Sequence, residues 1–463
     1  MVFDYIQTQV VVVGAGSAGI AAAIAAARSG VKTILIEKNS ELGGTSVTSW
    51  VSPFMSFHDS NSNPVNGGFL DEIIMELKKI GGTTGSLECK GKPPWGKNST
   101  ITPFDPYLLS YTYIRLLEDA GVNIMLHSFV SDVIMEKNNI VGVIVEGKGG
   151  RKIISSQVVI DASGDADVAY LSGVPCKKGR QKDGLMMPVT LYFRLGDVQF
   201  DKIKNYLENN LDDFRWYAFP VVKEPIIEKY DPEAFAFSGF IKAIEDSCQN
   251  GELYLGRETL NAFPGLRKGE LIANATRVNN IDSTNSLDLT KAELDCRKQV
   301  VSFVDFAKKS LPGFANCHLI NWASQVGIRE SRRIVGEYIL NEKDVIDGRH
   351  FEDVIVRSTY PVDIHNPDNK QSTWKSLSAL YYEIPYRSLV PKNIEKLLVA
   401  GRCISTTPEA HASTRIIANC ISMGQAAGMA AAISIDEETE VRKINISKLQ
   451  QRLIKTGQLV DVN

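Results

Sequence analysis

Residues 10–19 of this 463-residue chain read VVVVGAGSAG, and this stretch decides the fold. Its four valines form a continuous apolar run, as expected for a parallel β-strand that is covered on both faces. The glycine-rich turn leads into the Ala-rich segment 17–29, which is predicted to be a helix that ends at Gly30. Residues 33–36 form the second predicted strand, so the order strand, helix, strand predicts a right-handed βαβ unit.

The turn itself matches the GxGxxG fingerprint of dinucleotide-binding proteins. Gly14 permits the tight turn, Gly16 lets the backbone approach a pyrophosphate, and Gly19 lets the helix pack closely on the strand. Ser17 and Ala18 open the helix, where free N–H groups and the positive end of the helix dipole favour phosphates. The sequence therefore predicts a dinucleotide site at this turn.

An acidic residue and a glycine pair follow the second strand and narrow the choice of nucleotide. The carboxylate of Glu37 can accept hydrogen bonds from both ribose hydroxyls and would repel a 2′-phosphate, which disfavours NADP. The pair Gly43 and Gly44 lets a second backbone segment pass close to an extended dinucleotide, which favours FAD over NAD. The same predicted contact region includes Lys38, Thr45 and Ser46.

Four later motifs carry a resemblance to a known family: DASGDADVA at 161–169, VGIRESRRI at 326–334, VAGRCIS at 399–405 and GQAAG at 424–428. In this order they resemble the FAD-dependent oxidoreductase family, within the glutathione-reductase-type flavoprotein superfamily. Ser163 stands where the family usually has Thr. The resemblance implies FAD as cofactor, with further contacts from Val130, Ala162, Ser163, Gly164, Asp165, Gly401, Arg402, Gly424, Gln425 and Ala426.

The resemblance also implies where the flavin end lies. Gly401 and Arg402 are expected near the ribityl or pyrophosphate portion, and Arg402 stands where many related flavoproteins carry Asp. It is therefore expected to offset phosphate charge. A helix that opens near residues 422–424 is expected to aim its dipole at the flavin N1/O2 edge.

The predicted fold class is α/β: a Rossmann-like three-layer FAD-binding domain, discontinuous in sequence, with an inserted α+β substrate domain. Residues 1–175 are predicted to form its first part, within which 59–103 are an irregular excursion rich in Gly, Pro and polar residues. Residues 386–463 are predicted to complete it. Residues 176–385, where apolar runs are shorter, are predicted to be the substrate domain.

Composition limits the function classes. The net charge of −3 and the absence of a long basic patch disfavour nucleic acid, including tRNA modification, and an anionic membrane surface. No apolar stretch approaches the roughly 20 residues of a membrane span. None of the seven cysteines lies in a CxxC pair, so no disulfide framework, iron–sulfur cluster or other metal site is predicted. Buried, reduced thiols in a cytoplasmic protein are the expectation, and a homo-oligomer stays possible.

Two further absences narrow the reaction. The segment 45–50 after the paired glycines contains no Cys, which disfavours dithiol exchange at the flavin. No second GxGxxG with a strand before it and an acid after it occurs, since 147–150 lies in a hairpin context. NADH and NADPH are therefore expected to reduce the flavin poorly, and a small-molecule substrate is expected to meet the flavin directly.

Arginines and histidines are the candidates for binding this substrate and for transferring protons to or from it. Arg329 and Arg333 are four residues apart and could share a helix face as a carboxylate clamp; the alternative is an ion-pair network with Glu330 and Glu337. His365 is a candidate acid or base because histidine titrates near neutrality; the alternative is an ordinary loop histidine.

His411 and Arg415 lie in the segment that the resemblance places beside the flavin. The sequence-based interpretation is an oxidoreductase that transfers a hydride between flavin N5 and a small organic substrate, with organic anions among the candidates. The alternatives are a reductase of a C=C bond in a larger apolar substrate and a flavin-binding electron-transfer subunit of a complex.

Overall fold

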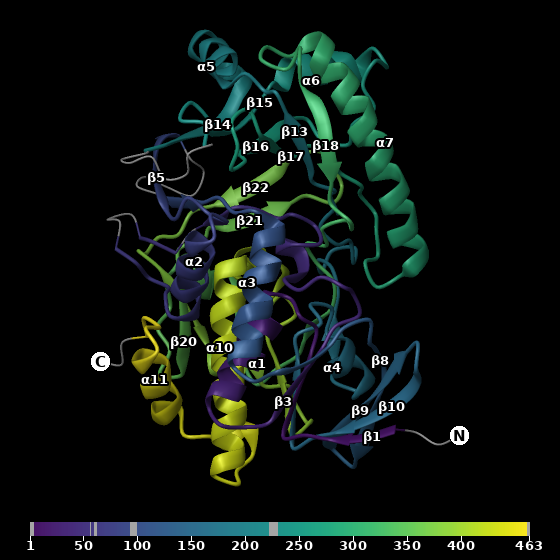
Figure 1. The fold of residues 1–463 in the computed structure, drawn as a ribbon, viewed down its shortest axis with the longest axis vertical. Coiled ribbons are helices and arrows are strands. Elements are labelled where there is room, and N and C mark those ends of the chain that lie inside the picture. Colours follow the sequence, from purple (N-terminus) through teal and green to yellow (C-terminus); the bar gives the residue numbers. More distant parts are fainter. Residues whose placement is uncertain (1–3, 56, 60–62, 93–99, 222–229, 461–463) are drawn as a thin grey trace.

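The computed structural model describes residues 4–55, 57–59, 63–92, 100–221 and 230–460. Two parts lie one above the other along the longest axis of the molecule (Figure 1). The lower part contains a five-stranded parallel sheet in the order β24-β11-β2-β3-β7. Its strands are β2 (Val10–Val13), β3 (Thr33–Ile36), β7 (Asn123–Met125), β11 (Val158–Asp161) and β24 (Leu397–Val399).

The two faces of this sheet are covered by different layers. Val10 and Val12 of β2 belong to a core shared with helices α1 (Ser17–Arg28), α3 (Pro106–Asp119) and α10 (Ile417–Asp436). Val11 and Val13 point the other way, into a core shared with an antiparallel meander. The meander and its parallel edge strand are β8 (Phe129–Glu136), β9 (Asn139–Gly147), β10 (Gly150–Ser155) and β1 (Asp4–Gln7). The predicted three-layer α/β fold is confirmed.

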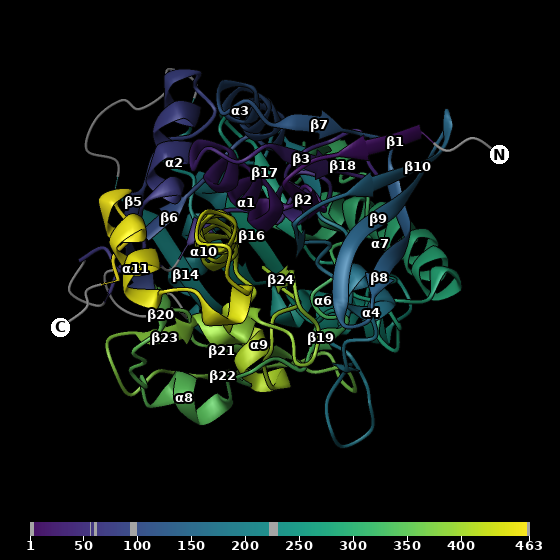
Figure 2. The same ribbon diagram turned by 90° about the horizontal axis from the view of Figure 1, so that it is seen from below.

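Helices α1 and α10 lie side by side, as both ribbon views show (Figures 1 and 2). Their sequences are rich in Ala and Gly, which lets the two backbones approach closely. A Cβ at Gly424 would lie 2.0 Å from the carbonyl oxygen of Ala18, and one at Gly428 would lie 2.2 Å from that of Ala22. The small residues of the GQAAG motif are thus explained by helix packing.

The upper part is built on a nine-stranded sheet in the order β18-β13-β17-β16-β15-β14-β5-β6-β4. Helices α5 (Phe200–Asn209), α6 (Ile241–Gln249) and α7 (Ser286–Ser310) share its aromatic core. Its strands are β4 (Phe54–Met55), β5 (Leu87–Lys92), β6 (Thr100–Thr102), β13 (Phe193–Gly196), β14 (Phe214–Pro220), β15 (Ala236–Gly239), β16 (Leu260–Pro264), β17 (Leu271–Asn274) and β18 (His318–Trp322).

The structure divides the chain differently from the sequence-based prediction at two places. Strands β5 and β6 lie in the excursion 59–103, yet they extend the upper sheet through pairing of β5 with β14; residues 60–62 and 93–99 lie outside the described residues. Conversely, buried side chains between 340 and 385 belong to the same core as α1 and α10. The high content of Gly, Pro and Lys in the excursion predicts a loop, so its two short strands were not predicted from the sequence.

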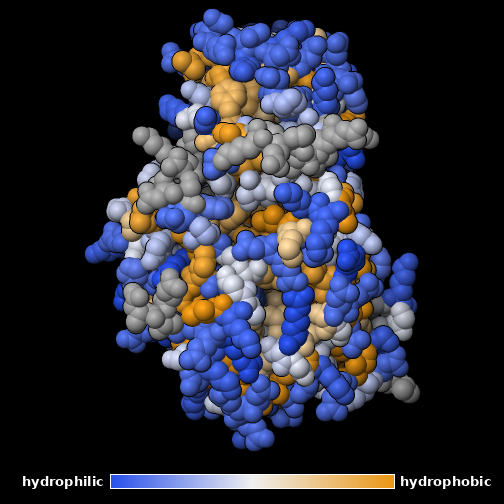
Figure 3. Space-filling model, turned by 60° about the vertical axis from the view of Figure 1, so that its left-hand side comes forward, coloured by the Kyte–Doolittle hydropathy of each residue, from blue (hydrophilic) through white to orange (hydrophobic). Residues whose placement is uncertain are grey.

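The remaining elements surround these two sheets. Among the described residues, no single helix is long and apolar enough to cross a membrane; α9 (Pro408–Thr414) and α10 meet the length and composition criteria only as a pair bent by 91°. Hydrophilic side chains cover most of the face shown in Figure 3. The other elements are α2 (Phe69–Lys79), α4 (Asp167–Leu171), β12 (Cys176–Lys177), β19 (Arg333–Ile334), α8 (Glu342–Ile346), β20 (Val354–Ser358), β21 (Val362–His365), β22 (Ser372–Lys375), β23 (Tyr382–Pro385), α9 (Pro408–Thr414) and α11 (Ile446–Lys455).

Candidate active site

A continuous cavity joins the glycine-rich turn of the lower part to the strands of the upper part. Its nucleotide side is formed where β2, β11 and β24 end, which is where open parallel sheets bind ligands. Its other side, here called the substrate side, is defined by Thr190, Tyr192, Trp216, Phe263, Asn274, Arg329, Tyr360, Asp363, His365 and Arg415.

The glycines of the nucleotide side form a cradle that side chains would fill. Gly14 has a φ of +95°, and a Cβ there would lie 2.6 Å from the carbonyl oxygen of Ala162. A Cβ at Gly16 would meet only the Cα of Gly44, at 3.9 Å, among the described residues. Gly16 caps α1 without any side-chain hydrogen bond, so the N–H groups of the first helical turn are left for a ligand. This arrangement fits the pyrophosphate of FAD.

Glu37 is held rigidly at the end of β3. Its Oε2 accepts a hydrogen bond of 2.7 Å from the backbone N–H of Ala15, and its Oε1 accepts one of 2.9 Å from that of Asn39. The carboxylate is therefore fixed beside the glycine-rich turn, as a ribose-binding group requires. Asn39 lines the cavity too, although no motif indicated it.

Most predicted cofactor residues line this cavity, but seven do not. Those seven are Gly19, Gly43, Ser46, Val130, Gly424, Gln425 and Ala426. The ones that line it are Gly14, Gly16, Ser17, Ala18, Glu37, Lys38, Gly44, Thr45, Ala162, Ser163, Gly164, Asp165, Gly401 and Arg402.

Several of the seven residues that do not line the cavity have structural roles. Gly19 lets α1 cross the turn, because a Cβ there would lie 1.8 Å from the carbonyl oxygen of Gly14. Ser46 donates to the carbonyl of Gly43, and Val130 is buried in the meander core. Gln425 donates to Thr456 Oγ1 and accepts from the N–H of Phe69.

The helix N-terminus that faces the cavity also differs from the prediction. Helix α10 begins at Ile417 rather than near 422–424, after a sharp bend that follows α9. Ile416 and Ile417 line the cavity, and Ile416 provides no side-chain cap. The positive end of the α10 dipole is thus available to the cavity from this earlier position.

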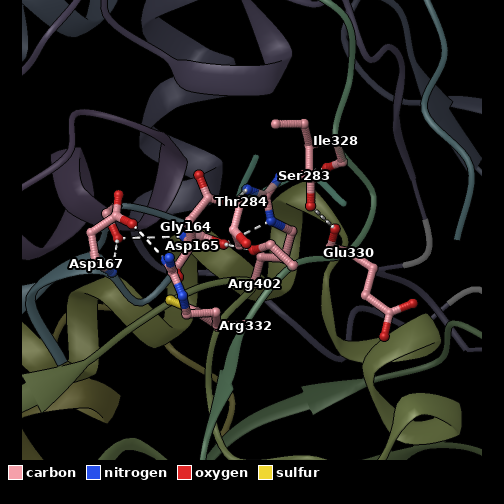
Figure 4. A network of polar contacts seen from close by, with 12 residues as sticks. Gly164, Asp165, Asp167, Ser283, Thr284, Ile328, Glu330, Arg332 and Arg402 are labelled. Atoms are coloured by element: carbon pink, nitrogen blue, oxygen red, sulfur yellow. Dashed lines mark hydrogen bonds and ion pairs between the residues drawn. The ribbon is translucent and has the colours of Figure 1, made fainter. Parts of the chain in front are cut away.

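The guanidinium of Arg402 is occupied by hydrogen bonds and an ion pair within the protein (Figure 4). Its Nε donates to the carbonyl of Gly164 at 2.8 Å, its Nη1 to the carbonyl of Ile328, and its Nη2 pairs with Asp165 Oδ1 at 2.6 Å. The guanidinium thereby joins three cavity-lining segments and has a carboxylate partner of its own. The ion pair with Asp165 already balances the charge of Arg402, so less of that charge is left to offset a phosphate than the sequence-based expectation assumed.

Two of the five predicted catalytic residues do not reach the cavity. Arg333 lies in strand β19 rather than on a helix, so it cannot share a helix face with Arg329. Its guanidinium forms an ion pair with Glu330 and donates to the carbonyl of Gly179 at 2.9 Å. The ion-pair alternative holds for Arg333 and Glu330, whereas Glu337 pairs with Arg442.

His411 is the second predicted catalytic residue that does not line the cavity. It is fully buried in α9, and its Nε2 lies 3.0 Å from the carbonyl oxygen of Arg329. Because a carbonyl only accepts, Nε2 carries the proton. Burial, with nearby Arg333 and Arg415, holds the pKa of His411 well below its usual value. The residue supports the backbone of Arg329 and is not placed to exchange protons with a substrate.

Arg329, Arg415 and His365 do meet on the substrate side, around a carboxylate that the motifs did not single out. Asp363 Oδ2 lies 3.3 Å from His365 Nε2 and 3.8 Å from Arg415 Nη2. Burial lowers the pKa of His365 to about 3, although Asp363 opposes the shift. His365 is therefore neutral near pH 7.

Positive charge outweighs negative charge in this region. Burial, followed by the neighbouring Arg257 and Arg415, lowers the pKa of Arg329 to about 10. Burial would raise the pKa of Asp363, but His365 and the arginines hold it well below its usual range. Arg257 and Arg329 are buried and Arg415 is largely buried, and Asp363 is the only carboxylate among the residues that define the substrate side.

Several of these positions carry no recognisable signal in the sequence. Tyr192 directly precedes β13, Trp216 lies in β14 and Asn274 ends β17, and each lies in a segment without a recognisable motif. The fold of the upper sheet, in which β13 and β14 are separated by three strands, brings all three residues to the cavity.

Fold and cavity together define a flavoprotein with a Rossmann-type nucleotide site. The model of the FAD dependent oxidoreductase family matches residues 9–453, and the chain belongs to this family. It is an enzyme that uses FAD.

Two individual proteins of known function resemble only part of this chain in sequence. Over 179 residues the chain is 29% identical to digeranylgeranylglycerophospholipid reductase 1 of Methanococcoides burtonii, and 36% of this chain matches 40% of that protein. Over 184 residues it is 29% identical to thiamine thiazole synthase of Methanococcus maripaludis, matching 37% of this chain and 61% of that protein. The chain thus aligns with less than two thirds of the length of either relative.

A solved structure shares the fold across nearly the whole chain. It is a geranylgeranyl bacteriochlorophyll reductase-like protein from Thermoplasma acidophilum, with a TM-score of 0.50 and 14% identity. The match covers 97% of this chain and 84% of that one.

Proposed function

We propose that this enzyme transfers a hydride between flavin N5 and a small organic anion, most simply a carboxylate. The observation that carries the proposal is the excess of positive charge on the substrate side. Arg329 and Arg415 line it, Arg257 is close enough to influence Arg329, and among the described residues that line this side Asp363 is the one carboxylate. Glu258, whose charge acts on Arg257, already pairs with Arg215. A buried cluster with surplus positive charge is costly unless an anion completes it.

The two arginines on the substrate side of the cavity have N–H groups that are free to bind a ligand. Arg329 donates through Nη1 to the carbonyl of Pro188 at 2.8 Å, which occupies one of its five N–H groups. Arg415 Nε is buried and makes no hydrogen bond to any described residue. A carboxylate can therefore be bound between Arg329 and Arg415, and such charge-assisted pairs fix its orientation.

When bound, FAD supplies the two-electron chemistry. The chain holds the nucleotide at the turn around Gly16 and at Glu37, and it offers the N-terminus of α10 to the cavity. Trp216 and Phe263 line the same cavity and add apolar surface that helps to exclude water.

A second candidate is reduction of a C=C bond in a larger apolar substrate. The partial similarity to digeranylgeranylglycerophospholipid reductase 1 favours it. The buried arginines of the substrate side favour the small anion, because a polyisoprenoid chain would leave their charges without partners.

The proposal is tested by binding benzoate and its neutral analogue benzamide to the FAD-loaded enzyme, followed by the change in flavin absorbance. Benzoate is expected to bind more tightly than benzamide. Arg329→Gln and Arg415→Gln should each weaken benzoate binding about 10- to 100-fold, since a hydrogen bond to a charged group contributes about 1.5–3 kcal/mol.

Arg28→Gln is the matched control, because Arg28 pairs with Glu72 on the outside of the molecule. It should bind benzoate as the unchanged enzyme does. Equal affinity for benzamide and benzoate, or full benzoate affinity in both cavity variants, would contradict the proposal.

A further inference from the structure

Three neighbouring strands of the upper sheet carry a chain of hydrogen bonds that ends at the cavity. Tyr192 directly precedes β13, Asn274 ends β17, and Arg257 lies just before β16. β17 pairs with both other strands, so the three residues lie side by side at one edge of the sheet. All three are buried, and Tyr192 and Asn274 line the cavity.

The direction of this chain follows from chemistry. Arg257 can only donate, so the atom of Asn274 that lies 3.0 Å from Arg257 Nη1 must be the amide oxygen. The amide nitrogen of Asn274 then faces Tyr192 and donates to its hydroxyl oxygen at 2.9 Å. Tyr192 is thus an acceptor in this contact, and its own hydrogen is not used there.

The hydroxyl hydrogen of Tyr192 is free to point into the cavity, which Tyr192 lines. Within the part of the chain that the structure describes, this hydroxyl makes no other hydrogen bond. The neighbouring groups are committed differently: Tyr360 donates to Asp363 Oδ2 at 3.1 Å, and His365 Nε2 faces the same oxygen. His365 Nδ1 in turn lies 3.2 Å from the hydroxyl of Ser372.

We infer that Tyr192 is the group that gives a proton to the substrate, and that Arg257 and Asn274 are positioning residues that aim its O–H bond into the cavity. This rests on the proposed function, and it narrows the substrate to a carboxylate that carries a carbonyl or, in the reverse direction, a hydroxyl group. His365, the acid or base expected from the sequence, is replaced in that role.

Protons and electrons balance when such a carbonyl substrate is reduced to an alcohol. Reduction of a carbonyl needs one hydride, which reduced FAD supplies, and one proton. The Tyr192 O–H bond breaks as the O–H bond of the product alcohol forms, and a solvent proton later restores the phenol. Arg257, Arg329 and Arg415 lie near enough to favour the tyrosinate that is left, while Asp363 disfavours it.

Burial raises the pKa of Tyr192, against the influence of these arginines, so the phenol keeps its proton at neutral pH. The titratable and charged groups that face it are Arg257, Arg329, Arg415, Asp363 and Tyr360. A donor that is protonated at rest and lies beside cations suits the reducing direction.

The test uses the FAD-loaded enzyme, photoreduced without oxygen and mixed with pyruvate, phenylpyruvate and glyoxylate, while flavin reoxidation is followed by stopped flow. Tyr192→Phe should slow reoxidation by the best oxo acid about 10²- to 10⁴-fold. Benzoate binding should change less than about threefold, because Arg329 and Arg415 hold the carboxylate.

Two further variants separate the role of the hydroxyl from that of packing. Asn274→Asp keeps the shape but turns an acceptor towards Tyr192, which should capture the hydroxyl hydrogen and slow reoxidation comparably. Tyr254→Phe is the control, since the Tyr254 hydroxyl pairs with Asp295 on the exposed side of α7. If Tyr192→Phe does not retain FAD, 3-fluorotyrosine at 192 should shift the alkaline limb of the rate profile to lower pH.

The possible results distinguish failure of the role of Tyr192 from failure of the proposed function. Reoxidation by Tyr192→Phe within threefold of the unchanged enzyme, or an unshifted profile with 3-fluorotyrosine, overturns the role of Tyr192 while benzoate binding still supports the anion site. If the unchanged enzyme binds no benzoate and reacts with no oxo acid, the proposed function fails, and this inference fails with it.

Discussion

Gly16 shows how a missing side chain shapes the cofactor site. A Cβ at this position would point into open space towards the cavity, with only Gly44 nearby among the described residues. Gly16→Val should therefore leave the protein folded but place methyl groups in the path of the pyrophosphate.

We expect Gly16→Val to abolish FAD binding, as measured by the flavin absorbance of the purified protein, which should otherwise carry one FAD per chain. Circular dichroism should stay unchanged. Gly149→Val is the control, because no atom lies within 4 Å of a Cβ built at Gly149. Full FAD occupancy in Gly16→Val would disprove the assignment of this turn.

His365 provides a second prediction at the scale of one residue. Its pKa is about 3 in the folded protein and near 6.5 when unfolded. Between these values the unfolded chain binds a proton that the folded chain does not, so the free energy of unfolding falls as the pH falls. The low pKa of Asp363 acts in the same direction, but only near and below its usual value of 3.8.

The contribution of His365 can be isolated by denaturant titrations between pH 7 and 5. His365→Gln should lose less stability than the unchanged protein as the pH falls through this window, by up to about 1.4 kcal/mol per pH unit. Parallel stability curves for the two proteins would show that His365 is not buried in its neutral form.

At the scale of elements, the contact between α1 and α10 fixes the back wall of the nucleotide side. Gly424 leaves no room for a methyl group, because its Cβ would lie 2.0 Å from the Ala18 carbonyl oxygen. Gly424→Ala should push the helices apart and lower the free energy of unfolding by about 1–3 kcal/mol. Thermal unfolding of the FAD-free protein checks this, with Gly149→Ala as the control; an unchanged midpoint would contradict the packing role.

The same elements show what the sequence could and could not predict. The run of valines in β2, the glycine-rich turn and Glu37 report local backbone geometry, so their placement followed directly from the residues. Arg333 and Gly424 were read from motifs as site residues, but those motifs also encode a buried ion pair and a close helix contact. A motif records that a residue is constrained without stating by what.

At the scale of the whole molecule, the substrate side exists only because two sheets meet. Tyr192 and Asn274 come from the upper sheet, whereas Asp363 and Arg415 come from segments packed on the lower core. Such long-range contacts leave no periodicity in the sequence, which is why Asp363 and the tyrosines were missed. Poor reduction of the flavin by NADH and NADPH stays a prediction from the sequence.

If the substrate is a small anion, its negative charge should be needed for reaction with the flavin, and a comparison of acids with their neutral amides measures this need. The FAD-loaded enzyme is mixed without oxygen with small hydroxy acids and, after photoreduction, with oxo acids, each paired with its neutral amide, and the flavin absorbance is followed. At least one acid is expected to bleach or reoxidise the flavin at least about tenfold faster than its amide, and Arg329→Gln should remove this difference. Equal or faster reaction of the neutral amides would contradict it.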